Sequence, residues 1–111
     1  NAFAKSLFIL FMISEVHPFT DGNGRISRIM MNAELVAADQ SKIIIPTVFR
    51  EDYLNALRRL TRRNDPSVLI RAISRVRQFS ANIQGDDFDA TRNYLEHCNA
   101  FKDADGYILK F

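Results

Sequence analysis

The sequence predicts an all-α fold of about five helices. Apolar residues recur at spacings of three and four in one segment after another, which is the period of helices with a buried face. Proline, glycine, aspartate and asparagine gather in the short stretches between these segments, where they favour turns and helix ends. We find no internal repeat and no low-complexity tract. We therefore expect residues 1–111 to form a single domain or part of one.

The composition is that of an ordinary globular protein. Hydrophobic residues make up 47% of the chain and charged residues 25%, and 111 residues suffice to bury roughly two thirds of the unfolded surface. The single cysteine, Cys98, excludes an intramolecular disulfide and fits a reducing compartment. The longest apolar stretch, residues 7–13, is too short to span a bilayer and follows no signal segment. We expect a cytoplasmic protein with no membrane partner.

The first 16 residues predict a helix that is apolar on nearly every side. A helix of this kind needs partners on several faces. We expect its exposed face to bind a partner, and a homo-oligomer is one option. Its main stripe holds Phe3, Leu7, Phe8, Phe11 and Met12, and other faces carry Ile9, Leu10 and Ile13.

Four further helices are expected. The second runs from about Gly24 to Ala38 and precedes a turn at 39–41 and an extended link at 43–46 that packs in the core. The third runs from Arg50 to about Asn64. The fourth starts at Pro66, whose missing N–H costs little in a first turn, and stops near Gly85. The fifth is capped by Asp86 or Asp87 and carries Phe88, Tyr94, Leu95, Cys98 and Phe101.

Between the first two helices, residues 17–28 read HPFTDGNGRISR and have the composition of an anion-binding loop. Gly22 and Gly24 permit positive φ angles and a close approach of the backbone, so several N–H groups can converge on an anion. A helix begins here, and the positive end of its dipole also favours a bound anion. Arg25 and Arg28 are three residues apart, so they share one face of the first turn and can grip two phosphate oxygens or two successive phosphates.

Two side chains of the same loop suit the chemistry of phosphate transfer. Asp21 is a hard oxygen ligand for Mg²⁺ that arrives with a nucleotide. Histidine is the only side-chain type whose unperturbed pKa lies near neutrality, and His17 follows the first helix, where it can take a proton from an attacking hydroxyl. Pro18 would end that helix and Phe19 would anchor the loop. A loop that binds no phosphate could use the same glycines and charges, but stability alone does not require a histidine, a carboxylate and two arginines together.

These residues resemble the signature of the Fic domain family, H-x-F-x-D/E-G-N-G-R-x-x-R, at every fixed position. The resemblance implies a helical Fic core that transfers AMP from Mg-ATP to a Ser, Thr or Tyr hydroxyl of a target protein. Doc-type relatives that phosphorylate carry a lysine where this chain has Gly24, which favours nucleotidyl transfer. The roles implied are general base for His17, metal binding for Asp21, α-phosphate binding for Gly22, Asn23 and Gly24, and β- and γ-phosphate binding for Arg25 and Arg28.

Other functions of the same loop stay open. The loop recognises phosphates and says little about the group beyond them, so transfer of another phosphate-containing group, or removal of AMP, fits the same residues. A non-catalytic nucleotide-binding or interaction module fits as well.

The resemblance covers the second half of a Fic domain. Fic domains normally place several helices and a β-hairpin flap before the motif, and nothing in residues 1–16 corresponds to them. We therefore expect residues 1–111 alone to bind Mg-ATP weakly and to be inactive on protein targets. Fic proteins are often restrained by a helix with the pattern S/T-x-x-x-E-G/N, which this sequence lacks. We expect any inhibitory helix to lie upstream or on a partner protein.

Positive charge is concentrated in the middle of the chain. Residues 50–77 hold eight arginines and three acids, whereas residues 78–111 hold three basic and six acidic side chains. No aromatic residues interleave the arginines to stack on bases, so the pattern favours a solvated face over a nucleic-acid interface. Nucleic acid or an acidic partner is the alternative.

Overall fold

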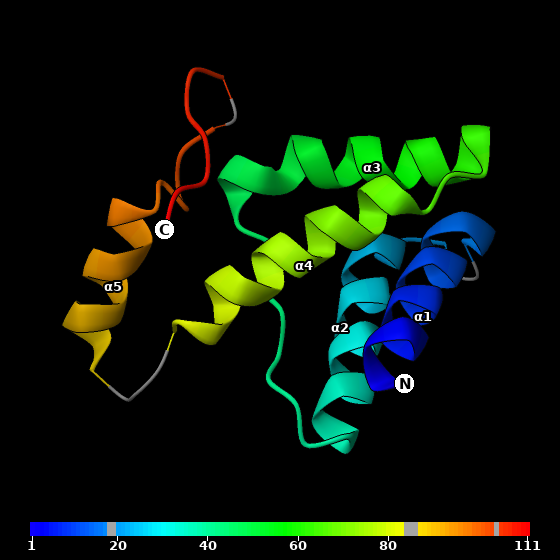
Figure 1. Cartoon of the computed structure of the whole chain (residues 1–111), viewed down its shortest axis with the longest axis horizontal. Coiled ribbons are helices and arrows are strands. Elements are labelled where there is room, and N and C mark those ends of the chain that lie inside the picture. The colour runs from blue at the N-terminus through cyan, green and yellow to red at the C-terminus, as the bar shows by residue number, and fades with distance from the viewer. Residues whose placement is uncertain (18–19, 84–86, 104) are drawn as a thin grey trace. The chain divides into compact units, whose positions relative to one another are not determined.

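The computed structural model describes residues 1–17, 20–83, 87–103 and 105–111. Within them the chain forms five α-helices, one short 3-10 helix and no strand, which confirms the all-α fold class (Figure 1). Two compact units are formed, residues 1–42 and 43–111. The helices are α1 (Ala2–Val16), α2 (Asn23–Ala37), α3 (Arg50–Arg63), α4 (Ser67–Ala81) and α5 (Phe88–His97), and the 3-10 helix η1 is Thr47–Phe49.

The first unit is an antiparallel hairpin of α1 and α2, which lie side by side in Figure 1. The two helices run in opposite directions, since Lys5 near the start of α1 and Glu34 near the end of α2 line the same shallow cavity. The amide oxygen of Asn1 caps α1 by accepting a hydrogen bond of 2.8 Å from the N–H of Ala4. The turn that contains the predicted loop therefore lies at one end of the hairpin.

The hairpin buries a different face of α2 from the apolar stripe that its sequence suggests, which consists of Ile26, Ile29, Met30, Ala33 and Val36. Ile29 is 64% exposed, whereas Met31 and Leu35 are fully buried. Ser27, one turn before Met31, is also fully buried, and its small side chain lets the helices approach closely. Packing against α1 selects this face because α2 is apolar on two sides. On α1, Leu10 is buried in the same way.

The second unit is built on α3 packed against α4. Its core contains Tyr53 and Ala56 of α3 with Ile73 and Phe79 of α4, all 2% exposed or less. The predicted bounds of α3 are confirmed. Acidic residues occupy its first turn and arginines its last turn, and each sign of charge is stabilised there by the helix dipole.

The ends of α4 and α5 differ from prediction. Helix α4 stops at Ala81, before Gly85, because the N–H groups of the next two residues bond in 3-10 fashion to Phe79 and Ser80. The side chain of Asp87 caps α5, accepting hydrogen bonds of 3.0 and 3.2 Å from two N–H groups of the first turn. Helix α5 ends at His97, so Phe101 lies beyond the helix and is exposed. Asp86 lies outside the described residues.

Helix α5 and the last residues are attached to α4 by a few specific contacts. The rings of Phe79 and Tyr94 stack with their centroids 5.9 Å apart. The guanidinium of Arg75 lies over the ring of Phe111 and donates a hydrogen bond of 3.1 Å to the carbonyl of Leu109. No helix within the described segments has the length and hydropathy needed to cross a bilayer.

Candidate functional site

His17 stands at the end of α1. Its backbone adopts the left-handed conformation, with φ 52° and ψ 59°, and its N–H donates to the carbonyl of Ile13 at 3.2 Å. A positive φ is uncommon for a residue with a side chain, and such residues concentrate at helix ends and functional sites. The imidazole is exposed, so it is accessible to an incoming substrate. Pro18 and Phe19, which follow it, lie outside the described residues.

Gly22 is the N-cap residue of α2 and adopts φ 75°, a conformation that favours glycine. Its N–H donates a hydrogen bond of 2.7 Å to Oδ1 of Asp21, and its carbonyl accepts from the N–H of Ile26 at 2.9 Å. Because glycine has no side chain, no side-chain oxygen of the N-cap residue competes with a ligand for the first-turn N–H groups. This helix start is thus suited to bind an anion.

Both arginine side chains fold back toward the start of their helix. A Cβ atom placed on Gly22 would lie 3.2 Å from Nη2 of Arg25, and one placed on Gly24 would lie 3.4 Å from Nη1 of Arg28. The absence of a side chain on each glycine therefore leaves room for a guanidinium beside the backbone. The glycines of the motif support the positions of its arginines as well as the turn.

The charges at this helix start favour a bound anion. The first turn of α2 contains no acidic residue, whereas Arg25 and Arg28 bring two positive charges to the positive end of the helix dipole. Among the described residues, no carboxylate forms a salt bridge with either arginine, and no hydrogen bond joins His17 to Asp21. An anion at this position would offset both the dipole and the arginine charges.

The donor set fits a metal that is carried in by a nucleotide. Within the described residues, no group of three or more His, Cys, Asp or Glu side chains could hold a metal ion. Mg²⁺ is usually bound by one or two carboxylates together with substrate phosphates and water, and Asp21 is exposed at the site. A single carboxylate therefore suits Mg²⁺ that is shared with phosphates.

Ser27 supports the site and was not among the residues singled out from the sequence. It is fully buried, and its Oγ donates a hydrogen bond of 2.7 Å to the carbonyl of Gly24. Ser27, Met31 and Leu35 form the buried stripe of α2. Their spacing of four residues is the sequence pattern from which the burial of Ser27 could have been predicted. Ser27 thus connects the motif backbone to the face that packs on α1.

All seven predicted site residues lie at the turn end of the hairpin. His17 ends α1, Asp21 and Gly22 precede α2, and the other four occupy its first two turns. Comparison with known proteins finds that residues 1–35 match the family model described as the Fic/DOC family. These residues are therefore similar to a fragment of a Fic domain. The matched residues include the whole motif from His17 to Arg28.

The chain is also similar to proteins named protein adenylyltransferase Fic. Those of Drosophila mojavensis and Drosophila melanogaster are each 38% identical to it over 64 residues, which is 58% of this chain. The match covers 12% of the first relative and 13% of the second, so the chain spans about an eighth of their length. No solved structure gives a significant match.

Proposed function

We propose that this Fic fragment forms part of a site that transfers AMP from Mg-ATP to a hydroxyl side chain of a target protein. The observation that carries the proposal is the placement of the described residues of the Fic motif at one end of the hairpin, with an exposed imidazole and two arginines folded toward the helix start. The names of the Drosophila relatives, which match over part of their length, support adenylyl transfer for the family.

The proposed step replaces the phosphoanhydride bond between the α- and β-phosphates of ATP by a phosphate ester bond to the target protein. The target hydroxyl oxygen attacks the α-phosphorus, the bond to the leaving pyrophosphate breaks, and the hydroxyl proton passes to His17. Gly22, Asn23 and Gly24 surround the α-phosphate, where their backbone can approach it closely. Mg²⁺, when bound, offsets charge on the phosphates.

The remaining charged residues hold the nucleotide. Arg25 and Arg28 bind the β- and γ-phosphates, where charge-assisted hydrogen bonds fix the pyrophosphate as it leaves. Asp21 holds the metal through a carboxylate oxygen. Both roles are electrostatic, so neither requires the arginines or the aspartate to change protonation state.

The test is labelling of a cell lysate by the full-length protein with ATP that carries the radioactive label on either the α- or the γ-phosphate. AMP transfer labels target proteins from the α-labelled nucleotide alone. His17→Ala should abolish labelling and change ATP affinity by no more than a few fold, because the base acts on the hydroxyl and not on the phosphates.

The second histidine offers a matched control. His97 is an exposed residue at the end of α5, and His97→Ala should leave labelling unchanged. Labelling from γ-labelled ATP that the wild-type protein adds to the lysate and that His17→Ala does not would show phosphoryl transfer and overturn the proposal. A full-length protein that binds ATP without labelling any target would identify a nucleotide-binding module.

A further inference from the structure

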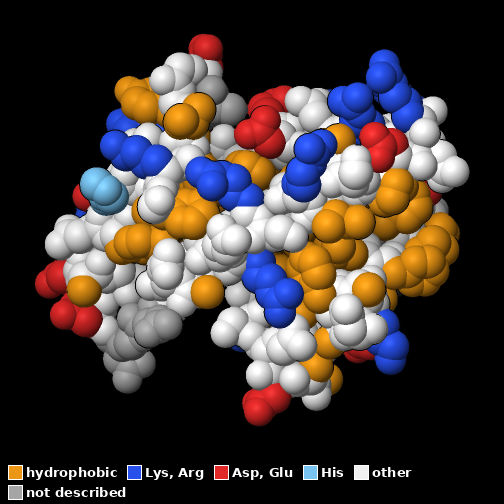
Figure 2. Space-filling view, viewed as in Figure 1, with side chains coloured by type: hydrophobic (Ala, Val, Ile, Leu, Met, Phe, Trp, Pro, Cys, Tyr) orange, Lys and Arg blue, Asp and Glu red, His pale blue; other side chains and the backbone are white. Residues whose placement is uncertain are grey.

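Helix α3 ends in a cluster of exposed guanidinium groups, which we call the arginine face. It consists of Arg58, Arg59, Arg62 and Arg63. Together with Asn55 these residues line a shallow cavity of about 260 Å³. Figure 2 shows Lys and Arg side chains gathered over the second half of α3.

The positive charge of the arginine face is barely offset by neighbouring acids. Among the described residues its one ion pair joins Nε of Arg59 to Asp65 at 3.9 Å, and both side chains are largely exposed. Asp65 also accepts hydrogen bonds from the hydroxyl and the N–H of Ser67. Asn55 accepts a hydrogen bond of 2.8 Å from Arg58. Within the described part of the chain, one carboxylate therefore pairs with one of the four guanidinium groups.

The helix dipole accounts for part of this cluster. Arg62 and Arg63 lie in the last turn, where the dipole favours cations. Arg58 and Arg59 lie one turn earlier, outside the strongest part of that field, and each has a like charge four residues later, which is unfavourable. An external anion would offset this repulsion.

We propose that the arginine face binds an acidic helical segment of another protein, with two carboxylates one turn apart. The pairs Arg58–Arg62 and Arg59–Arg63 are each separated by a helical rise of about 6 Å, which equals the spacing of glutamates four residues apart on a partner helix. Arginine binds carboxylates bidentately, so two such pairs define a register as well as a charge. The proposal is independent of adenylyl transfer.

Two features of α3 argue against binding of a nucleic acid to the arginine face. The arginine face extends over about 7.5 Å of helix rise, which is short for the run of phosphate contacts that holds a nucleic acid. None of the described residues of α3 is an exposed aromatic that stacks on bases. A longer polyanion that continued along α3 would also meet acidic side chains at its start.

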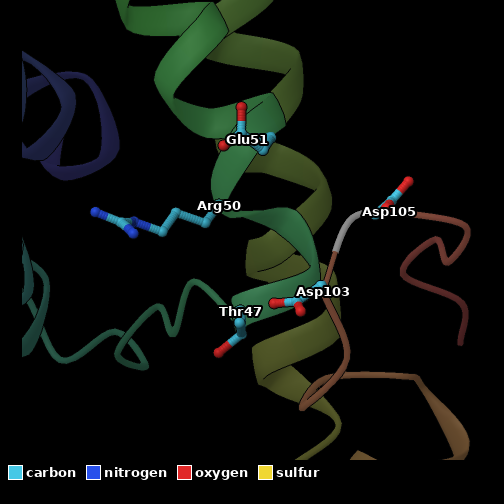
Figure 3. Close-up of a pocket in the computed structure, with 5 residues that line it drawn as sticks. All are labelled: Thr47, Arg50, Glu51, Asp103 and Asp105. Atoms are coloured by element: carbon cyan, nitrogen blue, oxygen red, sulfur yellow. The ribbon is translucent and has the colours of Figure 1, made fainter.

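A second cavity, of about 540 Å³, lies at the beginning of α3. Glu51, Asp103 and Asp105 contribute carboxylates to it, together with Thr47 and Arg50. Figure 3 shows the Arg50 side chain extending away from these carboxylates. The helix therefore presents negative charge at its start and positive charge at its end, which suits a short acidic segment and opposes a long polyanion.

The experiment measures binding of a fluorescent helical peptide that has two glutamates four residues apart, using the full-length protein and fluorescence anisotropy. The double variant R58E/R62E should weaken binding by about tenfold or more, since it converts two charge-assisted contacts into repulsions. R58Q/R62Q removes the attraction without adding charge and should weaken binding less. Circular dichroism of each variant checks that α3 is retained.

The matched control is K102E/K110E, which changes the net charge by the same amount at two exposed lysines of the same unit. It should leave peptide binding within about twofold, because charges separated by more than a Debye length are largely screened. Equal weakening by both double variants, or the absence of binding to the wild-type protein, would overturn the proposal. So would tighter binding of a DNA duplex than of the peptide at the same salt concentration.

Discussion

The two units of the chain place their exposed apolar side chains differently. In the first unit these side chains lie on the helices themselves, and Figure 2 shows hydrophobic surface over α1. Phe8 and Ile29 are each 64% exposed. In the second unit, α3 and α4 expose only Ile70 among large apolar residues, and the others lie in the link before η1, on α5 and in the last residues. The hairpin that carries the motif thus buries one face of each helix and leaves another uncovered.

The residues that give the site its local geometry are thus different from the exposed apolar residues of the same two helices. The turn, the helix start and the folded-back arginines depend on residues 17–28, all within the segment that matches the Fic/DOC family model. A helix with apolar residues on several faces needs more than one neighbour. The local geometry of the site thus lies within the hairpin, while apolar faces of α1 and α2 stay exposed beside it.

The largest effect expected from this comparison is on the core of the second unit. Phe79 is fully buried, and Phe79→Ala should lower the free energy of unfolding by about 3–5 kcal/mol through lost transfer free energy and the cavity left behind. Phe88, which is 73% exposed, offers the control, since Phe88→Ala should change stability by less than about 1 kcal/mol. Urea denaturation measures both.

Hydrogen exchange adds a spatial test of the two units. Phe79→Ala should increase exchange in α4 and α5 far more than in α1 and α2, because the two units have separate cores. An equal loss of protection in all four helices would show that the units unfold together and would remove the distinction between them.

The next effect concerns the site itself. Arg28→Ala removes a charge-assisted contact to the proposed γ-phosphate, so ATP binding to the full-length protein should weaken by about 1.5–3 kcal/mol. AMP lacks that phosphate and should bind almost as before. Calorimetry with the two nucleotides makes the comparison, and equal weakening of both would show that Arg28 supports the loop generally.

The fold was predictable wherever the local pattern was strong. Helix α3 has the bounds expected from its acidic first turn, its apolar stripe and its arginines. The end of α4 was placed too late, because Ile83 continues the apolar spacing while the backbone has already left the helix. Such an end depends on hydrogen bonds of two or three residues, which apolar periodicity does not report.

The faces of the helices and the side-chain geometry of the site were less predictable. Ile29 continues a regular stripe yet is exposed, while Ser27 is buried, because the neighbour that covers a helix is a tertiary property. The identities of the candidate site residues were read directly from the motif, and their roles stay predictions. That Arg25 lies over Gly22 depends on side-chain rotamers that no sequence pattern specifies.

Each unit contains one glycine with a positive φ angle, so the same substitution can be compared in the two units. Gly22 has φ 75° and Gly106 has φ 84°, so an alanine at either position should cost about 1–2 kcal/mol of backbone strain. A Cβ on Gly22 would also press on Arg25 at 3.2 Å, whereas one on Gly106 would have nothing within 4 Å. Gly22→Ala should therefore weaken ATP binding as well, and Gly106→Ala should not. Similar nucleotide affinities for the two variants would contradict this role of Gly22.

The smallest effect expected is a pH dependence at the corner between α3 and α4. Hydrogen bonds from the hydroxyl and the N–H of Ser67 hold the pKa of Asp65 below its ordinary value, and the charges of Arg59 and Arg71 act in the same direction. A lowered pKa means that the folded state binds the proton less readily than the unfolded state. The stabilisation is therefore present above about pH 4, the ordinary carboxyl range, and is lost as the pH falls through the folded-state pKa.

The measurement compares the melting temperatures of the wild-type protein and Asp65→Asn between pH 7 and pH 3. The asparagine keeps a hydrogen-bond acceptor and removes the charge, so the variant should be slightly less stable at pH 7, and the difference should shrink as the pH falls. Asp39→Asn serves as the control, because Asp39 is an exposed carboxylate of the first unit. A difference that stays constant over the whole range would show that neither the hydrogen bonds of Ser67 nor the neighbouring arginines lower the pKa of Asp65 in the folded state, and would contradict the prediction.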